Sequence, residues 1–279
     1  MLRGIDSAAS GMIALQRKQD ALTNNLANAE TPGFKQDASP LRSFPEVLLE
    51  QIRGREKGVQ ARLGTLSMGV YNQESLPLFL QGVLTETNMP FDVAINDQGI
   101  TPVQVDGRTV KPAAFFAVQT EEGTMRLTRN GRFSVNENGE LVTATGDFVL
   151  GQNGNRITGL DPLLKDVSIS SNGDIVAFPN DPQRTRTIGS IGMVIVENPN
   201  QLNKRDNGQY ELEGPGMAMI TGNLPAGLQL HHKMLEQSNV DMSQTITEMM
   251  ANIRLYEANQ KVLQAYDKTL EQLNTIGRV

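Results

Sequence analysis

The stretch NNLANAETPGFK (residues 24–35) marks the point where a helix ends and the chain changes direction. Pro32 suits the second position of a tight turn, and Gly33 suits the third position, where φ is positive. Three asparagines precede this turn, and a side-chain amide can both donate and accept hydrogen bonds. We therefore expect these asparagines to satisfy backbone groups where the helix gives way to the turn.

Residues 5–26 repeat apolar side chains with the alternating three- and four-residue spacing of a coiled-coil seam. This repeat is narrower than the apolar stripe of a helix that faces a globular core. Gln19 falls in the repeat, and a polar residue there can fix the register of paired helices at a cost in stability. The apolar residues that we assign to this part of the assembly seam are Ile5, Met12, Leu15, Leu22 and Leu26.

A second helix is predicted over residues 239–276, because residues 228–276 contain neither Gly nor Pro and Gly277 suits a helix C-cap. Ser238 and Asp241 form a plausible capping pair at its start. Such a helix would be about 55 Å long at ~1.5 Å per residue, which is too long for an ordinary compact domain. Its seam residues are Met242, Ile246, Met249, Ile253, Tyr256, Leu263 and Leu270, with Gln260 as a polar member.

The middle of the chain has the pattern of an all-β domain. Asn-Gly pairs, which favour hairpin turns, begin at positions 130, 138, 153, 172 and 207. Before this region, Ser43 and Glu46 with Pro45 between them predict one short helix in a connector. The expected strands are 91–95, 114–119, 133–135, 140–143, 167–170, 175–178 and 191–196.

The sequence therefore predicts an α+β protein of several domains. Residues 1–34 and 231–279 are expected to form one discontinuous helical coiled-coil domain. Residues 91–230 are expected to form a β-rich domain inserted between these helices, and residues 35–90 a connector.

Composition excludes several classes of protein. The 279 residues carry a formal charge of −6, so no basic excess exists to neutralise the phosphates of a nucleic acid. The absence of cysteine excludes disulfides, cysteine nucleophiles and thiolate metal sites. No run approaches the roughly 20 apolar residues that span a bilayer, so we expect no membrane insertion. Residues 27–29 resemble a signal-peptidase site, but charged residues interrupt the run before them, and we expect no cleaved signal peptide.

The search for chemistry predicts no catalytic residue, no metal site and no cofactor. His231 and His232 are adjacent, so their side chains point apart and make a poor pair of metal ligands; we expect them on the surface of a linker. The glycine-rich stretch 151–159 lacks the Lys-Ser/Thr of a phosphate-binding loop. Met242, Met249 and Met250 could line a promiscuous binding groove, although methionine at this spacing more often belongs to a helix interface.

Four separated blocks of the sequence resemble the bacterial flagellar basal-body rod and hook protein family. The first is the stretch quoted above, and the others are TNMPFDVAI (87–95), TRNGRFSVNENGELV (128–142), and the pair LEQSNVDM (235–242) and RLYEANQKV (254–262). The order and spread of these blocks along the chain make the resemblance specific. Residues Asp97, Asn136, Gln244, Thr245 and Ile253 depart from the family pattern and leave the type of member open.

The resemblance implies a structural subunit with an inner coiled-coil domain made from both termini and an outer β-rich domain. Such subunits leave the cell unprocessed through the flagellar type III export apparatus. They polymerise helically with copies of themselves and with other rod and hook proteins into the axial drive shaft of the extracytoplasmic basal body. The polar and hinge residues that match the family are Asn24, Asn25, Asn28, Thr31, Pro32, Gly33, Phe34, Ser238, Asn239, Arg254, Glu257 and Asn259.

Two other functions remain open at this point. A secreted adhesin or regulatory binder on the same fold would differ from a rod subunit only in its location. A β-rich carbohydrate hydrolase of the cell wall would need two close carboxylates, and no pair stands out among the 31 acidic residues. The length leaves no room for a further large outer domain, which favours a rod protein over a hook protein.

Overall fold

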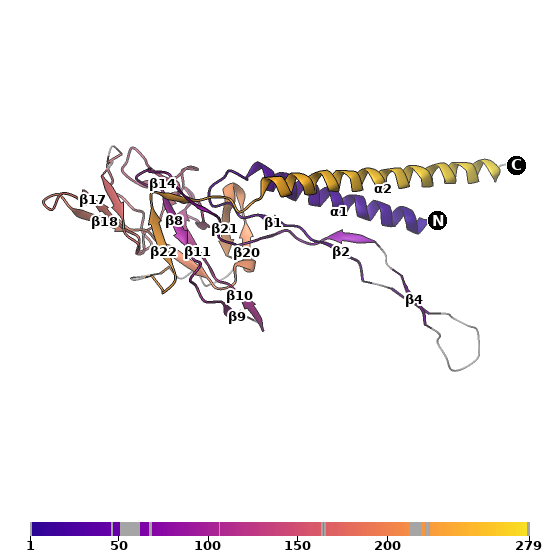
Figure 1. Cartoon of the computed structure of the whole chain (residues 1–279), viewed down its shortest axis with the longest axis horizontal. Coiled ribbons are helices and arrows are strands. Elements are labelled where there is room, and N and C mark those ends of the chain that lie inside the picture. Colours follow the sequence, from indigo (N-terminus) through magenta and orange to yellow (C-terminus); the bar gives the residue numbers. More distant parts are fainter. Residues whose placement is uncertain are drawn as a thin grey trace. The chain divides into compact units, whose positions relative to one another are not determined.

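The computed structural model describes residues 2–45, 47–50, 62–66, 69–105, 107–162, 164, 166–212, 219–220, 222 and 224–277. The architecture is α+β, with helices near both termini and strands between them (Figure 1). The chain divides into two compact units. Unit 1 comprises Met1–Ala27, Asp37–Pro77 and Val240–Val279, and unit 2 comprises Asn28–Gln36 and Leu78–Asn239. Within the described ranges, neither helix combines the length and the apolar character needed to cross a membrane.

Unit 1 contains both long helices, which lie side by side and antiparallel (Figure 1). α1 spans Leu2–Ala27 and α2 spans Met242–Ile276, close to the predicted ranges 5–26 and 239–276. The Asp241 side chain caps α2 by accepting a hydrogen bond from the Gln244 backbone N–H at 3.0 Å. At the other end the Gly277 N–H donates to the Leu273 carbonyl, so the predicted C-cap is confirmed.

The rest of unit 1 is a two-stranded ribbon that pairs successive strands of residues 37–50 with strands of residues 62–77. The short helix expected from Ser43 is wrong, because Ser43 pairs instead with Val70 on the returning strand. Glu46, the other half of that expected cap, lies outside the described residues. The pairs are β1 (Asp37–Ala38) with β6 (Leu76–Pro77), β2 (Leu41–Ser43) with β5 (Val70–Asn72), and β3 (Val47–Glu50) with β4 (Arg62–Leu66).

The turn that follows α1 belongs to unit 2 and has the predicted form. The Phe34 N–H donates to the Thr31 carbonyl at 3.2 Å, with Pro32 and Gly33 at the two central positions. Gly33 has φ +71°, and a Cβ there would collide with the backbone of Arg129. Only glycine therefore fits this position.

The strands of unit 2 form one eight-stranded antiparallel sheet and several smaller sheets. The large sheet has the order β13-β14-β15-β11-β12-β21-β20, with β19 also paired to β11. β16, β17 and β18 form a three-stranded sheet, and the remaining pairs are β7 with β23, β8 with β22, and β9 with β10. The bounds are β7 Leu84–Glu86, β8 Val93–Asn96, β9 Val103–Val105, β10 Arg108–Val110, β11 Ala113–Gln119, β12 Met125–Thr128, β13 Phe133–Val135, β14 Leu141–Thr143, β15 Phe148–Val149, β16 Val167–Ile169, β17 Asp174–Ala177, β18 Arg186–Ser190, β19 Met193–Val196, β20 Leu202–Lys204, β21 Gln209–Leu212, β22 Gln229–His232 and β23 Met234–Glu236, with 3-10 helices at Pro199–Gln201 and Asp206–Gly208.

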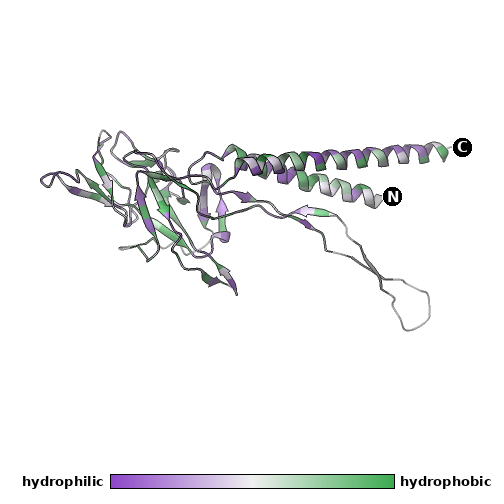
Figure 2. Cartoon of the chain, viewed as in Figure 1, coloured by the Kyte–Doolittle hydropathy of each residue, from purple (hydrophilic) through white to green (hydrophobic). Residues whose placement is uncertain are grey.

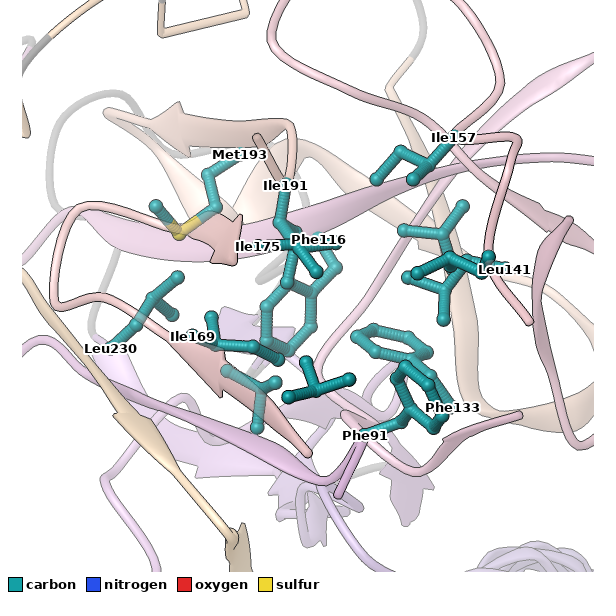
Figure 3. Packing of buried hydrophobic residues seen from close by; sticks show 14 of the residues in the cluster. Phe91, Phe116, Phe133, Leu141, Ile157, Ile169, Ile175, Ile191, Met193 and Leu230 are labelled. Atoms are coloured by element: carbon teal, nitrogen blue, oxygen red, sulfur yellow. The ribbon is translucent and has the colours of Figure 1, made fainter. Parts of the chain in front are cut away.

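β11 lies at the centre of unit 2 and is buried on both faces. Successive side chains of a strand point to opposite faces, so a doubly buried strand reads as a continuous apolar run. Phe116 packs into the cluster of Figure 3, where its ring meets Phe133 edge-on at 5.1 Å between centroids. Phe115 points to the other side and contacts Phe79 and Tyr210. The aromatic core of the chain therefore lies in unit 2.

All seven predicted strands of residues 91–196 are confirmed to within two or three residues, as β8, β11, β13, β14, β16, β17 and β19. The Asn-Gly pairs at 138, 172 and 207 form the hairpin turns of β13–β14, β16–β17 and β20–β21. The expectation for His231 and His232 is wrong, because both are half-buried in β22 rather than in a linker. The His232 ring contacts the Pro90 carbonyl at 2.8 Å, and burial lowers the pKa of this histidine.

Four charged side chains form a buried cluster in unit 2, and each is no more than 3% exposed. Lys35 Nζ lies 2.6 Å from Glu236 Oε1, and Arg129 Nε lies 2.9 Å from Glu236 Oε2. Arg129 also donates to Asp97 Oδ2 at 2.7 Å. Burial, followed by repulsion from Arg129, lowers the pKa of Lys35 from 10.5 to about 8.

The lowered pKa of Lys35 predicts a dependence of stability on pH. Between about pH 8 and 10.5 the unfolded chain binds a proton at Lys35 that the folded chain has released. The contribution of Lys35 to the unfolding free energy therefore rises with pH across this window, and it is lost as the pH falls through about 8. An NMR titration of the lysine side chains, with Lys35 assigned through Lys35→Arg, should give a midpoint well below those of the exposed lysines. A midpoint of Lys35 among the exposed lysines would contradict this result.

Candidate functional site

The candidate site is the α1–α2 pair of unit 1, where the two helices approach closely through glycine. A Cβ on Gly4 would overlap the Tyr266 hydroxyl, and a Cβ on Gly11 would lie 3.3 Å from Asn259 Nδ2. These contacts repeat every seven residues on both helices, which is the repeat of helices that stay in contact along their length. The contact line is therefore built from small residues on α1 and larger residues on α2.

A polar layer interrupts this line one heptad further on. Asn252 is 3% exposed, and its Nδ2 donates to the Leu15 carbonyl at 2.9 Å and to Gln19 Oε1 at 2.8 Å. The prediction for Gln19 as a polar member of the pair agrees with this contact. Gln260, which was predicted as a polar member of the seam, is exposed in the single chain, and its neighbour Asn259 faces Gly11.

The ribbon covers a second side of α1. Ser10 of α1 lies directly against Gly69, next to β5, so a Cβ on Gly69 would collide with the serine hydroxyl. Near the end of α1, Asn25 is 1% exposed and forms two hydrogen bonds with one ribbon residue. Its Nδ2 donates to the Asp37 carbonyl at 3.0 Å, and its Oδ1 accepts from the Asp37 N–H at 2.9 Å. The expectation that this asparagine satisfies backbone groups agrees with the geometry.

The predicted seam residues have three different environments in unit 1. Leu15 and Leu22 are 5% exposed, and the Leu15 carbonyl accepts the hydrogen bond from Asn252 of α2. Those at the flanks of the contact are half-buried, and these are Ile5, Met12, Leu26, Met249, Tyr256, Leu263 and Leu270. Met242, Ile246 and Ile253 are at least 41% exposed, so α1 does not cover them.

α2 carries apolar side chains on both flanks of the side that faces α1. Each residue turns about 100° around a helix, so Ile253 lies about 100° to one side of Asn252 and Leu255 about 60° to the other. We call the first group stripe A and the second group stripe B. Stripe A consists of Met242, Ile246, Met250 and Ile253, which are 41–54% exposed; stripe B consists of Leu255, Val262, Leu273 and Ile276, which are 44–73% exposed.

The C-terminal end of α2 extends past the N-terminal end of α1 (Figure 1). Gly4 already lies opposite Tyr266, so at most three residues of α1 remain to meet the last ten of α2. Apolar residues nevertheless continue along the whole of α2, as Figure 2 shows. Leu273 is 46% exposed, although it continues the seven-residue line of Asn252, Asn259 and Tyr266, and Ile276 is 73% exposed.

The predicted polar and hinge residues divide between the units. Asn239 joins two parts of unit 2, because its Oδ1 accepts from the Gln36 N–H at 2.7 Å and its Nδ2 donates to the Leu78 carbonyl at 2.9 Å. In the turn, Thr31 Oγ1 donates to Asn28 Oδ1 at 3.2 Å, and Phe34 is buried with Lys204 Nζ 4.4 Å from its ring centroid. The remaining residues of this set lie as follows: Asn24, Arg254 and Glu257 are exposed, and Pro32, Ser238 and Asn259 are half-buried.

Sequence reasoning missed the residues that decide how closely the helices approach. Gly4, Gly11 and Asn252 are not apolar, so a search for an apolar repeat passes over them. Their signal is the seven-residue spacing of Gly4 with Gly11, and of Asn252 with Asn259. Stripe B was missed because small residues (Ala251, Ala258 and Ala265) alternate with its larger ones.

Within the described ranges, no group of three or more His, Asp or Glu side chains is arranged to hold a metal ion. The arrangement supports contact with other protein surfaces, because contiguous exposed apolar side chains mark interaction sites.

The polar layer predicts a large effect of one isosteric substitution. Asn252→Asp replaces a buried donor with a carboxylate that faces two acceptors, the Leu15 carbonyl and Gln19 Oε1. We expect the variant to lose about 3 kcal/mol or more of helix-pair stability at neutral pH, and to recover part of it when the carboxyl is protonated. Hydrogen exchange of α1 and α2 amides measures this, with Asn274→Asp on the exposed end of α2 as control. Equal protection in both variants would contradict the polar layer.

Comparison with known proteins identifies three segments of the chain. A model described as "Flagella basal body rod protein" matches residues 5–35, and a model of the flagellar hook protein FlgE/F/G D1 domain matches residues 109–177. A model of the flagellar basal body rod FlgEFG protein C-terminal region matches residues 231–276. The first and third segments include α1 and α2, and the second lies in unit 2 around β11.

Several relatives align with the whole chain. The flagellar hook-basal body complex protein FlhO of Bacillus subtilis is 36% identical over 283 residues, which cover 100% of both chains. The flagellar basal-body rod protein FlgG of Borreliella burgdorferi is 30% identical over 288 residues, again with 100% of both chains covered. FlgG of Caulobacter vibrioides is 29% identical over 97% of each chain. The chain therefore belongs to the bacterial flagellar basal-body rod protein family.

Proposed function

We propose that the chain polymerises helically, with copies of itself and with other rod and hook proteins, into the axial drive shaft of the flagellar basal body. Members of this family are structural subunits of the flagellar rod and not enzymes. The proposal adds the mode of assembly, the contact surfaces and the route of export. It does not require a cofactor or a catalytic group.

One observation carries the proposal: α2 has apolar side chains on three sides, and α1 covers one of them. Stripe A and stripe B both remain exposed in a single chain. The part of α2 that follows Tyr266, the residue opposite Gly4 of α1, is also left largely uncovered by α1. Burying apolar surface contributes roughly 25 cal/mol per Å², so two uncovered stripes favour two different neighbours. A subunit that contacts one neighbour with stripe A and another with stripe B repeats head to tail, and such a repeat produces a filament when it does not close into a ring.

The ribbon of unit 1 supports the same proposal. Isolated two-stranded ribbons are marginally stable in water, and this ribbon pairs with no third strand within the described residues. Apolar side chains are exposed on it, including Phe44 at 39% and Tyr71 at 37%, whose rings lie 5.1 Å apart. We expect the ribbon to gain its stability by packing against a neighbouring subunit.

The organisation into a discontinuous coiled-coil domain is part of the proposal. The seven-residue repeat of Gly4–Tyr266 and Gly11–Asn259 supports a coiled coil between the ends of the chain. We propose α1 and α2 as this domain, within the expected ranges 1–34 and 231–279; residues 28–36, 78–90 and 231–239 are grouped with the β-rich unit instead. The polar residues Asn24, Arg254 and Glu257 are proposed to contact neighbouring subunits.

The location of the assembled protein is proposed to be outside the cytoplasm, after type III export without a cleaved signal peptide. α1 is amphipathic, and Arg17, Lys18 and Asp20 interrupt any continuous apolar run in it. This pattern is unlike the apolar segment of a secretory signal.

Each stripe can be tested separately, because its residues are exposed in the single chain. Ile246→Lys with Ile253→Lys disrupts stripe A, and Leu255→Lys with Val262→Lys disrupts stripe B. Surface substitutions usually change stability by about 0.5 kcal/mol or less, so helix content and the thermal midpoint of the monomer should stay close to those of the unmodified chain. Incorporation into basal bodies should fail in both variants.

Gln272→Lys is the matched control, since Gln272 is exposed on the polar side of α2 away from both stripes. It should be incorporated normally. Normal incorporation of a stripe variant would remove that stripe from the proposed interfaces, and loss of helix content in the monomer would show that the stripe supports the fold instead.

The experiment that tests the function itself is mass spectrometry of purified hook-basal bodies from the native organism, before and after deletion of the gene. We expect the protein in the particles and the loss of hooks after deletion. Its absence from the particles, together with normal motility after deletion, would contradict the proposal and favour a binder that uses the same fold.

A further inference from the structure

The buried charge cluster of unit 2 is centred on one carboxylate. Glu236 Oε1 accepts from Lys35 Nζ at 2.6 Å, from the Gly82 N–H at 2.8 Å and from Arg129 NH2 at 3.2 Å. Glu236 Oε2 accepts from Arg129 Nε at 2.9 Å. The Glu236 carbonyl also accepts from the Gly33 N–H at 2.8 Å. One residue therefore joins the turn after α1, the segment before β7 and the end of β12.

The cluster is balanced only when Glu236 is in place. It contains two cations, Lys35 and Arg129, and two anions, Asp97 and Glu236, with side chains 1–3% exposed. Lys111 reaches Asp97 only at 3.8 Å from a half-exposed position. Without Glu236, two cations would remain buried beside a single carboxylate, and an uncompensated buried charge strongly disfavours the folded state.

The charge balance of the cluster depends on the last segment of unit 2 to be added along the chain. Lys35 is 201 residues and Arg129 is 107 residues before Glu236, so the missing charge is supplied by the last strand of unit 2. β23 brings it by pairing with β7, next to the pairing of β22 with β8. The burial of Arg129 beside β12 therefore depends on a segment that pairs with neither β12 nor β11.

We propose that unit 2 closes fully only after residues 229–239 have docked, because Glu236 then neutralises the buried cations Lys35 and Arg129. We call this role of Glu236 an electrostatic lock. Before docking, Lys35 and Arg129 stay solvated and the large sheet remains open at the end of β12. Docking neutralises the cluster, closes the sheet, and holds residues 33–36 beside residues 234–239. The lowered pKa of Lys35 reflects the cost of burying this charge, because burial and Arg129 lower the pKa while Glu236 raises it. The proposal does not depend on polymerisation.

The test uses three variants of the full chain. Below the pKa of Lys35, Glu236→Gln keeps the shape but leaves a net positive cluster, and Glu236→Gln with Lys35→Met restores the balance by removing one cation. Glu211→Gln is the matched control, since Glu211 pairs with Arg205 at 2.7 Å in the same unit but with both side chains at least 30% exposed. The readout is the hydrogen-exchange protection of β11 and β12, which contain no partner of residues 229–239.

We expect Glu236→Gln to reduce the protection of β11 and β12 by about 100-fold, as strongly as that of β7 and β23. The double variant should regain at least about tenfold of this protection, although it has lost one more ion pair. Glu211→Gln should match the unmodified chain.

Two results would overturn the lock. If Glu236→Gln lowers hydrogen-exchange protection only in β7 and β23, Glu236 stabilises only its own strand pair. A double variant no better protected than Glu236→Gln would show that the separate contacts, rather than the charge balance, stabilise unit 2. If Glu236→Gln does not fold at all, recovery of a folded chain in the double variant supports the proposal, and failure of both variants overturns it.

Discussion

The carboxylate of Glu236 is the contact on which the form of unit 2 depends. Its oxygens accept hydrogen bonds from Lys35, Gly82 and Arg129, which belong to three distant segments. Lys35, Arg129 and Glu236 also lie in three of the sequence blocks that resemble the flagellar rod and hook family. Blocks that are separate along the chain thus meet at one buried point. The contact between Lys35 and Glu236 joins the first segment of unit 2 to its last strand.

The two units are stabilised in different ways. Unit 2 has an aromatic and aliphatic core on both faces of β11, and a single chain completes it. Unit 1 has a narrow helix contact that includes Gly4, Gly11 and Asn252, and it leaves stripes A and B in water. Apolar residues make up 38% of the chain; those of unit 2 form a buried core, whereas many of those on α2 in unit 1 stay exposed. Unit 2 has a complete core, whereas unit 1 still exposes apolar side chains. This difference suits a subunit that completes its folding when it assembles with its neighbours.

Local pattern predicted most of the secondary structure. Apolar spacing predicted both helices, and Gly33 and Gly277 predicted how the chain leaves them, because these signals act over a few residues. The helix expected at Ser43 failed since pairing with Val70, 27 residues away, overrides a local cap. Leu15 and Leu22, which were predicted as seam residues, are buried, whereas Gly4 and Gly11 were missed because close approach requires an absent side chain. The Glu236 cluster was also missed, since ion pairs between distant residues have no periodic signal.

The two hydrogen bonds between Asn25 and Asp37 have a mechanical consequence. An amide side chain that both donates to and accepts from one backbone residue reproduces a rung of a β-ladder, so the last turn of α1 is attached to the ribbon by two parallel bonds. A single hydrogen bond would allow rotation about its own axis, but two bonds resist rotation of the helix about its axis. Torsion applied to the ribbon would therefore be transmitted directly to α1. In a shaft that turns under load, this pair of bonds would add torsional stiffness within every subunit.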